Sequence, residues 1–309
     1  MPRGKKKTVA FIAGPTAGGK SALALALARR LDGVVINADS MQVYADLRVL
    51  TARPGAAEEA GAPHELYGVI DGAEAFSAAR WARLARAAID DALAQGKLPI
   101  LVGGTGLYFR ALEQGLSPIP EIPAAVKAQA RALWAQQGEA GVAARLTRLD
   151  PVAAARIAPG DRQRMLRALE VALATGTPLS TWQQKPGEGL AARADLEIRR
   201  LVLAPARATL YQRIDARVGA MLDNGAVEEV RRLMARRLEP DLPVMKALGV
   251  KELSAMDAGA LDQTEAVSLL QRNTRRYAKR QLTWLRHQCV DWHWQDEKFI
   301  IREIEKIFS

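Results

Sequence analysis

The segment Gly14-Pro15-Thr16-Ala17-Gly18-Gly19-Lys20-Ser21 sets the class of fold for this chain of 309 residues. It matches G-x-x-x-x-G-K-[ST], in which glycines let the backbone wrap closely around an anion so that successive N–H groups point at it. The run from Thr8 to Ala13 is apolar, as in a buried strand, and Ser21 to Leu31 is alanine-rich with leucines at helical spacing. A strand, a glycine-rich loop and a helix predict a phosphate-binding loop at the positive end of the helix.

Two residues of the loop have chemical roles of their own. Lys20 adds a full positive charge, and the Ser21 hydroxyl can hold Mg²⁺, the one cofactor that the sequence predicts. Taken alone, the loop suggests a nucleotide-binding protein with ATP as its ligand. The loop does not identify the substrate, so the identification has to come from the rest of the sequence.

Strand and helix patterns alternate after the loop. Val34 to Ala38 and Leu98 to Val102 predict buried strands, and Phe76 to Gln95 predicts a helix with Ser77 as its N-cap and Gly96 as its stop. Such alternation indicates a parallel sheet with helices on both faces. We therefore expect an α/β core of the P-loop nucleoside-triphosphatase type.

A proline-rich segment from Ser117 to Pro123 ends this pattern. Residues 124–185 show only helical patterns, which predicts an all-helical insertion domain within a core formed by residues 1–123 and 186–309. Turns are expected near Gly138, Asp150-Pro151 and Gly160-Asp161, with Gly176 closing a helix. Beyond the insertion, we expect a strand over Ile198 to Leu203 and helices over Arg207 to Asp223, Ala226 to Arg237 and Gln263 to His287.

Composition narrows the class of partner. Lys and Arg number 44 against 34 acidic residues, for a net charge of +10, which fits a polyanion such as nucleic acid. The single cysteine, Cys289, excludes a disulfide within the chain and a thiolate zinc site, and the three histidines are too scattered for a metal cluster. No apolar run approaches the roughly 20 residues of a membrane helix. We expect a soluble, cytoplasmic monomer.

One carboxylate stands out near the predicted phosphate site. Asp39 follows the second strand, whereas the third strand ends in Gly103-Gly104-Thr105-Gly106, where ATPases usually place an acid. A carboxylate at Asp39 would face the bound phosphate and suits a general base that acts on an incoming nucleophile. A loop-capping role or an outer ligand of Mg²⁺ are the alternatives.

The segment from Gln271 to Gln288 predicts a basic helix without acids. Arg272, Arg276 and Arg280 are spaced four apart and so share one face, which indicates contact with a phosphate backbone. Pairing with acids elsewhere in the chain is the alternative. The insertion carries basic residues as well, so we expect a polyanion to contact both domains. The basic residues of the insertion are Lys127, Arg131, Arg162, Arg164 and Arg167.

Five segments together resemble a known family. They are Gly14 to Ser21, Asp39-Ser-Met-Gln-Val-Tyr44, Val102-Gly-Gly-Thr-Gly-Leu-Tyr108, Arg167-Ala-Leu-Glu170 and Ala278-Lys-Arg-Gln-Leu-Thr-Trp-Leu-Arg286. In this order they are similar to the bacterial tRNA dimethylallyltransferases, over about residues 8 to 286. The resemblance implies transfer of a dimethylallyl group from its diphosphate to N6 of adenosine 37, beside the tRNA anticodon.

The resemblance also implies roles for single residues. The loop would hold the pyrophosphate leaving group, with Lys20 and Mg²⁺ on Ser21 neutralising its charge. Asp39 would take the N6 proton, Thr105 would contact the adenosine and Arg217 would clamp the diphosphate. The base must be flipped out of its stack to reach the loop.

The positions implied to contact tRNA, in an anticodon stem-loop, come from both domains. They are Asp39, Ser40, Met41, Gln42, Thr105, Lys127, Gln163, Arg164, Met165, Leu166, Arg167, Met245, Lys246, Ala247, Leu248, Gly249, Val250, Lys279, Arg280, Gln281, Leu282, Thr283, Trp284, Leu285 and Arg286.

Two segments depart from the family pattern, and three other functions compete. Leu50-Thr51-Ala52-Arg53-Pro54 stands where the family usually has Gly-Thr-Ala-Lys-Pro, and Gly249-Val250 stands for Gly-Tyr. An adenylate isopentenyltransferase would need neither the insertion nor the basic helix. A P-loop nucleotide kinase would not share the segments beyond residue 160, and a non-catalytic RNA-binding protein would have no use for an intact Lys20, Ser21 and Asp39.

Overall fold

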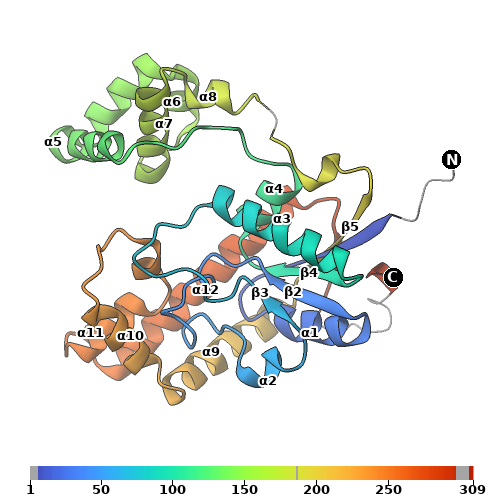
Figure 1. Cartoon of the computed structure of the whole chain (residues 1–309). Coiled ribbons are helices and arrows are strands. Elements are labelled where there is room, and N and C mark those ends of the chain that lie inside the picture. The colour runs from blue at the N-terminus through green and yellow to red at the C-terminus, as the bar shows by residue number, and fades with distance from the viewer. Residues whose placement is uncertain (1–5, 186, 297–305, 309) are drawn as a thin grey trace. The chain divides into compact units, whose positions relative to one another are not determined.

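The computed structural model describes residues 6–185, 187–296 and 306–308 of the chain, shown in Figure 1. It forms two compact units. The first contains the described residues up to Glu113 and from Leu190 onward, and the second runs from Gln114 to Gly189. The second unit begins before the predicted boundary at residue 124, because the proline-rich segment belongs to it rather than to the core.

A six-stranded parallel sheet forms the centre of the first unit, with the strand order β3-β2-β4-β1-β5-β6. The strands β1, β2 and β4 lie close to their predicted positions, and β5 starts two residues earlier than expected. The short edge strands β3 and β6 were not predicted. The strands are β1 (Lys7–Ala13), β2 (Gly33–Asn37), β3 (His64–Glu65), β4 (Leu98–Gly103), β5 (Leu196–Leu203) and β6 (His293–Gln295).

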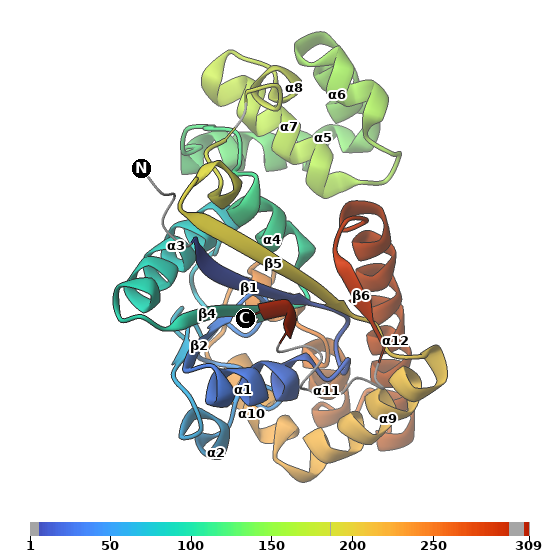
Figure 2. The ribbon, with the colours of Figure 1, turned by 90° about the vertical axis from the view of Figure 1, so that its right-hand side faces the viewer.

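Alternate residues of β1 enter two separate hydrophobic clusters because successive side chains of a strand point to opposite faces. Ala10 and Ile12 pack with Leu23 and Leu27 of α1 (Lys20–Arg30). Val9 and Phe11 face the other cluster, which includes residues of α3 (Ala78–Ala94) and α4 (Gly106–Glu113). Figure 2 shows α1 and α3 on opposite faces of the sheet. Ser77 caps α3 by accepting the Arg80 N–H at 3.2 Å, as predicted.

The C-terminal half of the first unit is mainly helical. Its helices are α9 (Arg207–Asp223), α10 (Ala226–Ala235), α11 (Val250–Asp257) and α12 (Gln263–Gln288), with the 3₁₀ turns η1 (Leu190–Ala192) and η2 (Pro243–Lys246). The short helix α2 (Ala56–Glu59) lies in the N-terminal part, between β2 and β3. The helix α12 starts with a capping box in which Asp262 accepts the Glu265 N–H at 2.8 Å. It packs its buried positions, every three or four residues, against α9 and α11.

The second unit contains four helices in its described residues: α5 (Ala124–Leu149), α6 (Pro151–Arg156), α7 (Arg162–Thr175) and α8 (Leu179–Trp182). The predicted turns are confirmed, since Gly138 interrupts α5 and Asp150 caps α6. Asp161 and Gly176 cap the two ends of α7. Nowhere in the described residues does a helix combine the length and the apolar character that crossing a membrane requires.

Candidate active site

The predicted phosphate-binding loop connects β1 to α1. Gly19 is the N-cap of α1 with φ of 90°, a left-handed conformation that suits glycine. The Lys20 ammonium donates to the Pro15 carbonyl at 2.6 Å, so the side chain folds back over the loop. Burial lowers the pKa of Lys20 to about 8, while the charge of Asp39 raises it and that of Arg217 lowers it further. The loop therefore holds its lysine beside a second cation and one carboxylate.

The second cation is the predicted Arg217 of α9. Its guanidinium donates to Thr16 Oγ1 at 3.3 Å and to the Thr51 carbonyl at 3.1 Å. Burial lowers the pKa of Arg217, and the charge of Asp39 opposes that shift. Its Nε is buried and lacks a hydrogen-bond partner among the described residues. An anion bound at the loop would supply the missing acceptor and counter-charge.

A second arginine of α9, which the sequence interpretation missed, also reaches the loop. A Cβ atom placed on Gly19 would lie 3.7 Å from Nη1 of Arg213, so this guanidinium sits at the start of α1. Arg213 and Arg217 are one helical turn apart and so share one face of α9. That i, i+4 spacing was the available signal.

Asp39 lies in a turn directly after β2. Its Oδ1 accepts the Met41 N–H at 2.9 Å, and its own N–H donates to Asn37 Oδ1 at 2.8 Å. Besides Lys20 and Arg217, three tyrosines lie within reach of its charge: burial raises the pKa values of Tyr67, Tyr108 and Tyr277, and Asp39 raises them further. The structure thus places the predicted carboxylate near the phosphate loop among phenols that stay protonated. The loop-capping alternative is also met by the Met41 contact.

Thr105 is linked to Asp39 by hydrogen bonds to Ser40, the residue that follows Asp39. The Ser40 N–H donates to Thr105 Oγ1 at 2.9 Å, and the two hydroxyls are 3.3 Å apart. Thr105 N–H also reaches the Ala38 carbonyl at 3.3 Å. Because these bonds join the ends of β2 and β4, the predicted base and the residue expected to contact adenosine belong to one hydrogen-bonded layer at the carboxyl edge of the sheet.

The glycines after β4 are explained by close packing. A Cβ on Gly103 would lie 2.0 Å from the Ala38 carbonyl oxygen, one on Gly104 would lie 2.1 Å from Gln281 Nε2, and one on Gly106 would lie 2.1 Å from the Trp284 ring. A side chain at Gly103 would push the end of β4 away from the end of β2. A side chain at Gly104 or Gly106 would push this segment away from the inner face of α12. The glycines therefore bring the two strand ends and α12 together around the site.

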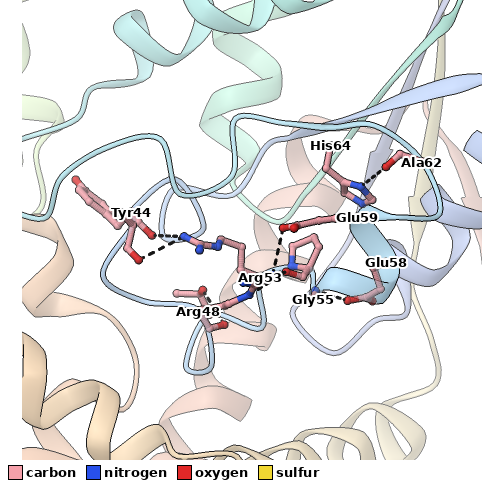
Figure 3. Close-up of polar contacts among 11 residues, drawn as sticks. Tyr44, Arg48, Arg53, Gly55, Glu58, Glu59, Ala62 and His64 are labelled. Atoms are coloured by element: carbon pink, nitrogen blue, oxygen red, sulfur yellow. Dashed lines mark hydrogen bonds and ion pairs between the residues drawn. The ribbon is translucent and has the colours of Figure 1, made fainter.

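The segment from Leu50 to Pro54, which departs from the family pattern, lies in a loop beside this site that is held by many hydrogen bonds. Arg53 Nη1 donates to the Tyr44 carbonyl at 3.0 Å, and Arg48 Nη2 donates to the Pro54 carbonyl at 2.7 Å and reaches Glu59 at 3.3 Å, as Figure 3 shows. Gln42, predicted to contact tRNA, donates to the Thr51 carbonyl at 2.9 Å. Thr51 O thus receives both Gln42 and Arg217, so the loop helps to orient the arginine.

The predicted basic helix is confirmed as part of α12, and its cations divide between two roles. Arg275 pairs with Asp215 of α9, the acidic partner that the alternative interpretation required. The remaining predicted cations are exposed, and Arg280 lies 5.5 Å from the centroid of the Tyr277 ring. The exposed cations are Arg272, Arg276, Lys279, Arg280 and Arg286. This face is called the basic face of α12 below.

Five residues predicted to contact tRNA have buried side chains: Met165, Ala247, Val250, Gln281 and Leu285. Met165 is part of the hydrophobic cluster of the second unit, and Leu285 packs in the main core. These side chains are therefore not available to RNA in this structure. Periodicity alone could have marked Leu285 as an inward position, because it lies seven residues from Ala278 and so shares the apolar face of α12.

Other predicted contacts are accessible. Gln163, Arg164 and Arg167 are exposed on α7, and Lys127 is half-buried on α5. Arg164 pairs with Asp161 at 3.3 Å in the first turn of its helix. In the first unit, Lys246 is exposed and pairs with Asp241 at 3.3 Å. Each unit thus presents exposed cations of its own.

A parallel α/β core, a glycine-rich loop with three cationic side chains around it, and a carboxylate beside the Thr105 and Ser40 hydroxyls are the features of an α/β protein with a P-loop-like fold. The chain belongs to the IPP transferase family, whose sequence profile matches residues 42–288. The isopentenyl transferase profile matches residues 7–67, the segment that contains the phosphate-binding loop and Asp39.

Individual relatives of the chain support the same family. The tRNA dimethylallyltransferase of Methylobacterium nodulans is 57% identical over 95% of this chain and 96% of its own length, and that of Azorhizobium caulinodans is 53% identical over 93% and 91%. A solved tRNA isopentenylpyrophosphate transferase from Bacillus halodurans is 35% identical, with a TM-score of 0.67 and coverage of 98% and 95%. A eukaryotic dimethylallyltransferase acting on tRNA gives a TM-score of 0.79 at 29% identity, over 94% of this chain and 74% of its own.

Proposed function

We propose that this chain transfers the dimethylallyl group of dimethylallyl diphosphate to N6 of adenosine 37 in the anticodon loop of tRNA. One observation carries the proposal most directly: Asp39 lies close enough to Lys20 and Arg217 for its charge to act on both, while β4 ends in glycines packed against α12. The site thus offers a base for an incoming nucleophile beside an anion site. The relatives named tRNA dimethylallyltransferase support the transfer of a dimethylallyl group to tRNA.

The phosphate-binding loop would bind the diphosphate. The N–H groups at the start of α1 would face the anion, and Lys20, Arg217 and Arg213 would add positive charge around it. As the allylic C–O bond breaks, its electron pair goes to the leaving pyrophosphate, and these cations stabilise the charge that develops there. The anion would also be a counter-charge for Arg217, whose buried Nε has no hydrogen-bond partner among the described residues.

Mg²⁺ is the proposed cofactor, and the residues present fit it. Ser21 is exposed in the first turn of α1, where its hydroxyl can be one ligand. The described residues include no group of three His, Cys, Asp or Glu side chains that could hold a metal by itself. An ion that takes most of its ligands from water and substrate phosphates is the usual situation for Mg²⁺. When bound, it neutralises charge on the diphosphate.

The acceptor side uses Asp39 and Thr105. The N6 lone pair forms the new C–N bond to the allylic carbon, and the N6 proton passes to the Asp39 carboxylate. The Met41 N–H fixes one oxygen of Asp39 in the turn. Thr105, held by Ser40, can orient the adenine edge. A positioned base of this kind contributes roughly 10² to 10⁴ in rate.

The RNA would be held by the basic face of α12 and by the exposed cations of the second unit. Both groups of cations would contact phosphates regardless of the RNA sequence. These contacts would position the anticodon loop so that the base can be flipped into the site. We further propose that the protein acts as a monomer in the cytoplasm, where its tRNA substrate is found. Gel filtration with light scattering tests the first of these statements.

Donor and acceptor can be tested together. The purified protein with Mg²⁺ is given labelled dimethylallyl diphosphate and either unmodified tRNA or AMP, and in parallel labelled ATP with AMP. We expect label in tRNA only, as N6-dimethylallyladenosine. Label in AMP from the prenyl donor would indicate an adenylate isopentenyltransferase. Phosphate transfer from ATP without prenylation would indicate a nucleotide kinase, and binding of tRNA without any transfer would indicate an RNA-binding protein.

A further inference from the structure

We infer that Gln281 is a positioning residue that ties the phosphate-binding loop to the turn after β4. Its Oε1 accepts the Thr16 N–H at 2.8 Å, and its Nε2 donates to the Gly104 carbonyl at 3.0 Å. Gln281 is 6% exposed, and its bond to Gly104 is buried while its bond to Thr16 is partly buried. The inference rests on the proposed function, because that function assigns the loop to the diphosphate and the turn to the adenosine.

The geometry of the tie requires an amide side chain. The Thr16 N–H needs an acceptor and the Gly104 carbonyl needs a donor, and glutamine supplies both from one planar group. Space is reserved for it, since a Cβ on Gly104 would lie 2.1 Å from Nε2. A buried donor or acceptor left without its partner costs more than the bond itself contributes. The two backbone segments are therefore held at a fixed spacing.

The two segments that Gln281 joins belong to the two sides of the proposed site. Thr16 also receives Arg217 on its hydroxyl, and Gly104 immediately precedes Thr105. Thr105 in turn holds Ser40, the neighbour of Asp39. Gln281 thus joins the diphosphate side of the site to the side that carries the base. It does so from the inner face of α12, while Lys279 and Arg280 beside it are exposed on the basic face.

Gln281→Met tests the inference, because methionine has a similar size and offers neither the acceptor nor the donor. We expect inorganic pyrophosphate to bind about tenfold more weakly and kcat for prenyl transfer to fall about tenfold or more, from the loss of two hydrogen bonds that join the two segments. Affinity for the anticodon stem-loop should stay within about twofold, since Gln281 is not on the RNA-facing side. Thr274→Val is the matched control: this buried hydroxyl of α12 donates at 2.7 Å to Leu270 of the same helix.

Hydrogen exchange measured by mass spectrometry separates positioning from general folding. In Gln281→Met, faster exchange should be confined to peptides that contain residues 14–19 and 103–106. Faster exchange throughout the first unit would overturn the inference in favour of a purely structural role. Unchanged pyrophosphate binding and turnover would also overturn it, and so would a loss of stem-loop affinity at unchanged pyrophosphate binding.

The inference and the proposed function fail in different ways. If the wild-type protein makes no N6-dimethylallyladenosine, the proposed function fails, and the pyrophosphate and exchange comparisons still decide whether Gln281 holds the two segments. If the wild-type protein is active and the variant matches it, only the role of Gln281 is wrong.

Discussion

The buried carboxylate of Glu229 accepts the Leu50 N–H at 2.9 Å, across 179 residues of sequence. The same carboxylate accepts the N–H groups of Arg48 at 2.6 Å and Val49 at 2.9 Å. Three consecutive backbone donors of the loop after Tyr44 therefore end on one side chain of α10. The next residue, Thr51, offers its carbonyl to Arg217, so Glu229 holds the segment that orients a cation of the proposed diphosphate site.

Replacement of Glu229 by alanine should therefore affect stability and anion binding together. One buried N–H group, that of Leu50, and two partly buried ones would lose their acceptor, and we expect the free energy of unfolding to fall by about 3 kcal/mol. Pyrophosphate should also bind more weakly, because Thr51 no longer holds Arg217 in place. Urea unfolding and calorimetric titration measure the two effects. Glu228→Ala, an exposed neighbour in the same turn, is the control, and equal effects of the two substitutions would contradict this role.

The lowered pKa of Lys20 predicts how pyrophosphate binding depends on pH. With a folded-state pKa of about 8, the Lys20 side chain is charged below that pH and loses its charge as the pH rises through it. Affinity contributed by Lys20 should therefore decline above about pH 8. In Lys20→Arg the guanidinium stays charged, so the wild-type affinity should fall relative to this variant as the pH rises from about 7 to about 9.5. Pyrophosphate itself titrates in this range, but equally for both proteins.

The same shift has a consequence for the unliganded protein. Because the pKa of Lys20 is lowered on folding, the unfolded chain binds more protons between about pH 8 and the ordinary value of 10.5. The contribution of Lys20 to stability therefore becomes more favourable as the pH rises through this window. Lys20→Met should be more stable than the wild type at pH 7, and the difference should shrink toward pH 10. A difference that grows with pH would contradict the assigned pKa.

Asp39→Asn tests the proposed base. Asparagine keeps an oxygen for the Met41 N–H, so the turn should persist, but it cannot accept the N6 proton. We expect kcat to fall by about 10² to 10⁴, with tRNA and pyrophosphate affinities within a few-fold of the wild type. Single-turnover kinetics and filter binding provide the two readouts. If RNA affinity falls as far as turnover does, Asp39 positions the RNA instead.

Charge reversal on the basic face of α12 should weaken tRNA binding. Arg276→Glu with Arg280→Glu removes two exposed cations, so affinity should fall and the slope of log K against log salt should become shallower by about one to two. The control is Arg83→Glu with Arg232→Glu, which changes the net charge equally at exposed positions of α3 and α10. Unchanged affinity in the first variant, or equal loss in both, would place the RNA elsewhere.

The sequence predicted those parts of the site that are local. The phosphate loop, the carboxylate after β2 and the basic helix each rest on a contiguous pattern, and a hydrogen-bonded turn of a few residues fixes Asp39. The long helices were also predicted well, because α9 begins and ends at the predicted residues. Capping residues such as Ser77 and Asp161 gave the helix starts directly.

The parts that were missed depend on contacts between distant segments. Gln281 and Thr16 are 265 residues apart, so no local pattern could distinguish a tie to the loop from an RNA contact. The pairing of a basic residue of α12 with a distant acid was kept as an alternative, but no local pattern could identify Arg275 and Asp215, which are 60 residues apart. The strands β3 and β6 are two and three residues long, too short for an alternating pattern to show.

The central claim is that the loop binds a leaving pyrophosphate while Asp39 takes a proton from the acceptor base. It is tested most directly in a single turnover of enzyme, unmodified tRNA and dimethylallyl diphosphate with Mg²⁺, followed by mass spectrometry of the digested tRNA and by quantification of the released anions. The account predicts one pyrophosphate for each N6-dimethylallyladenosine, formed at position 37 and without ATP. Pyrophosphate released without prenylated adenosine, or a product that forms only with ATP, would contradict it.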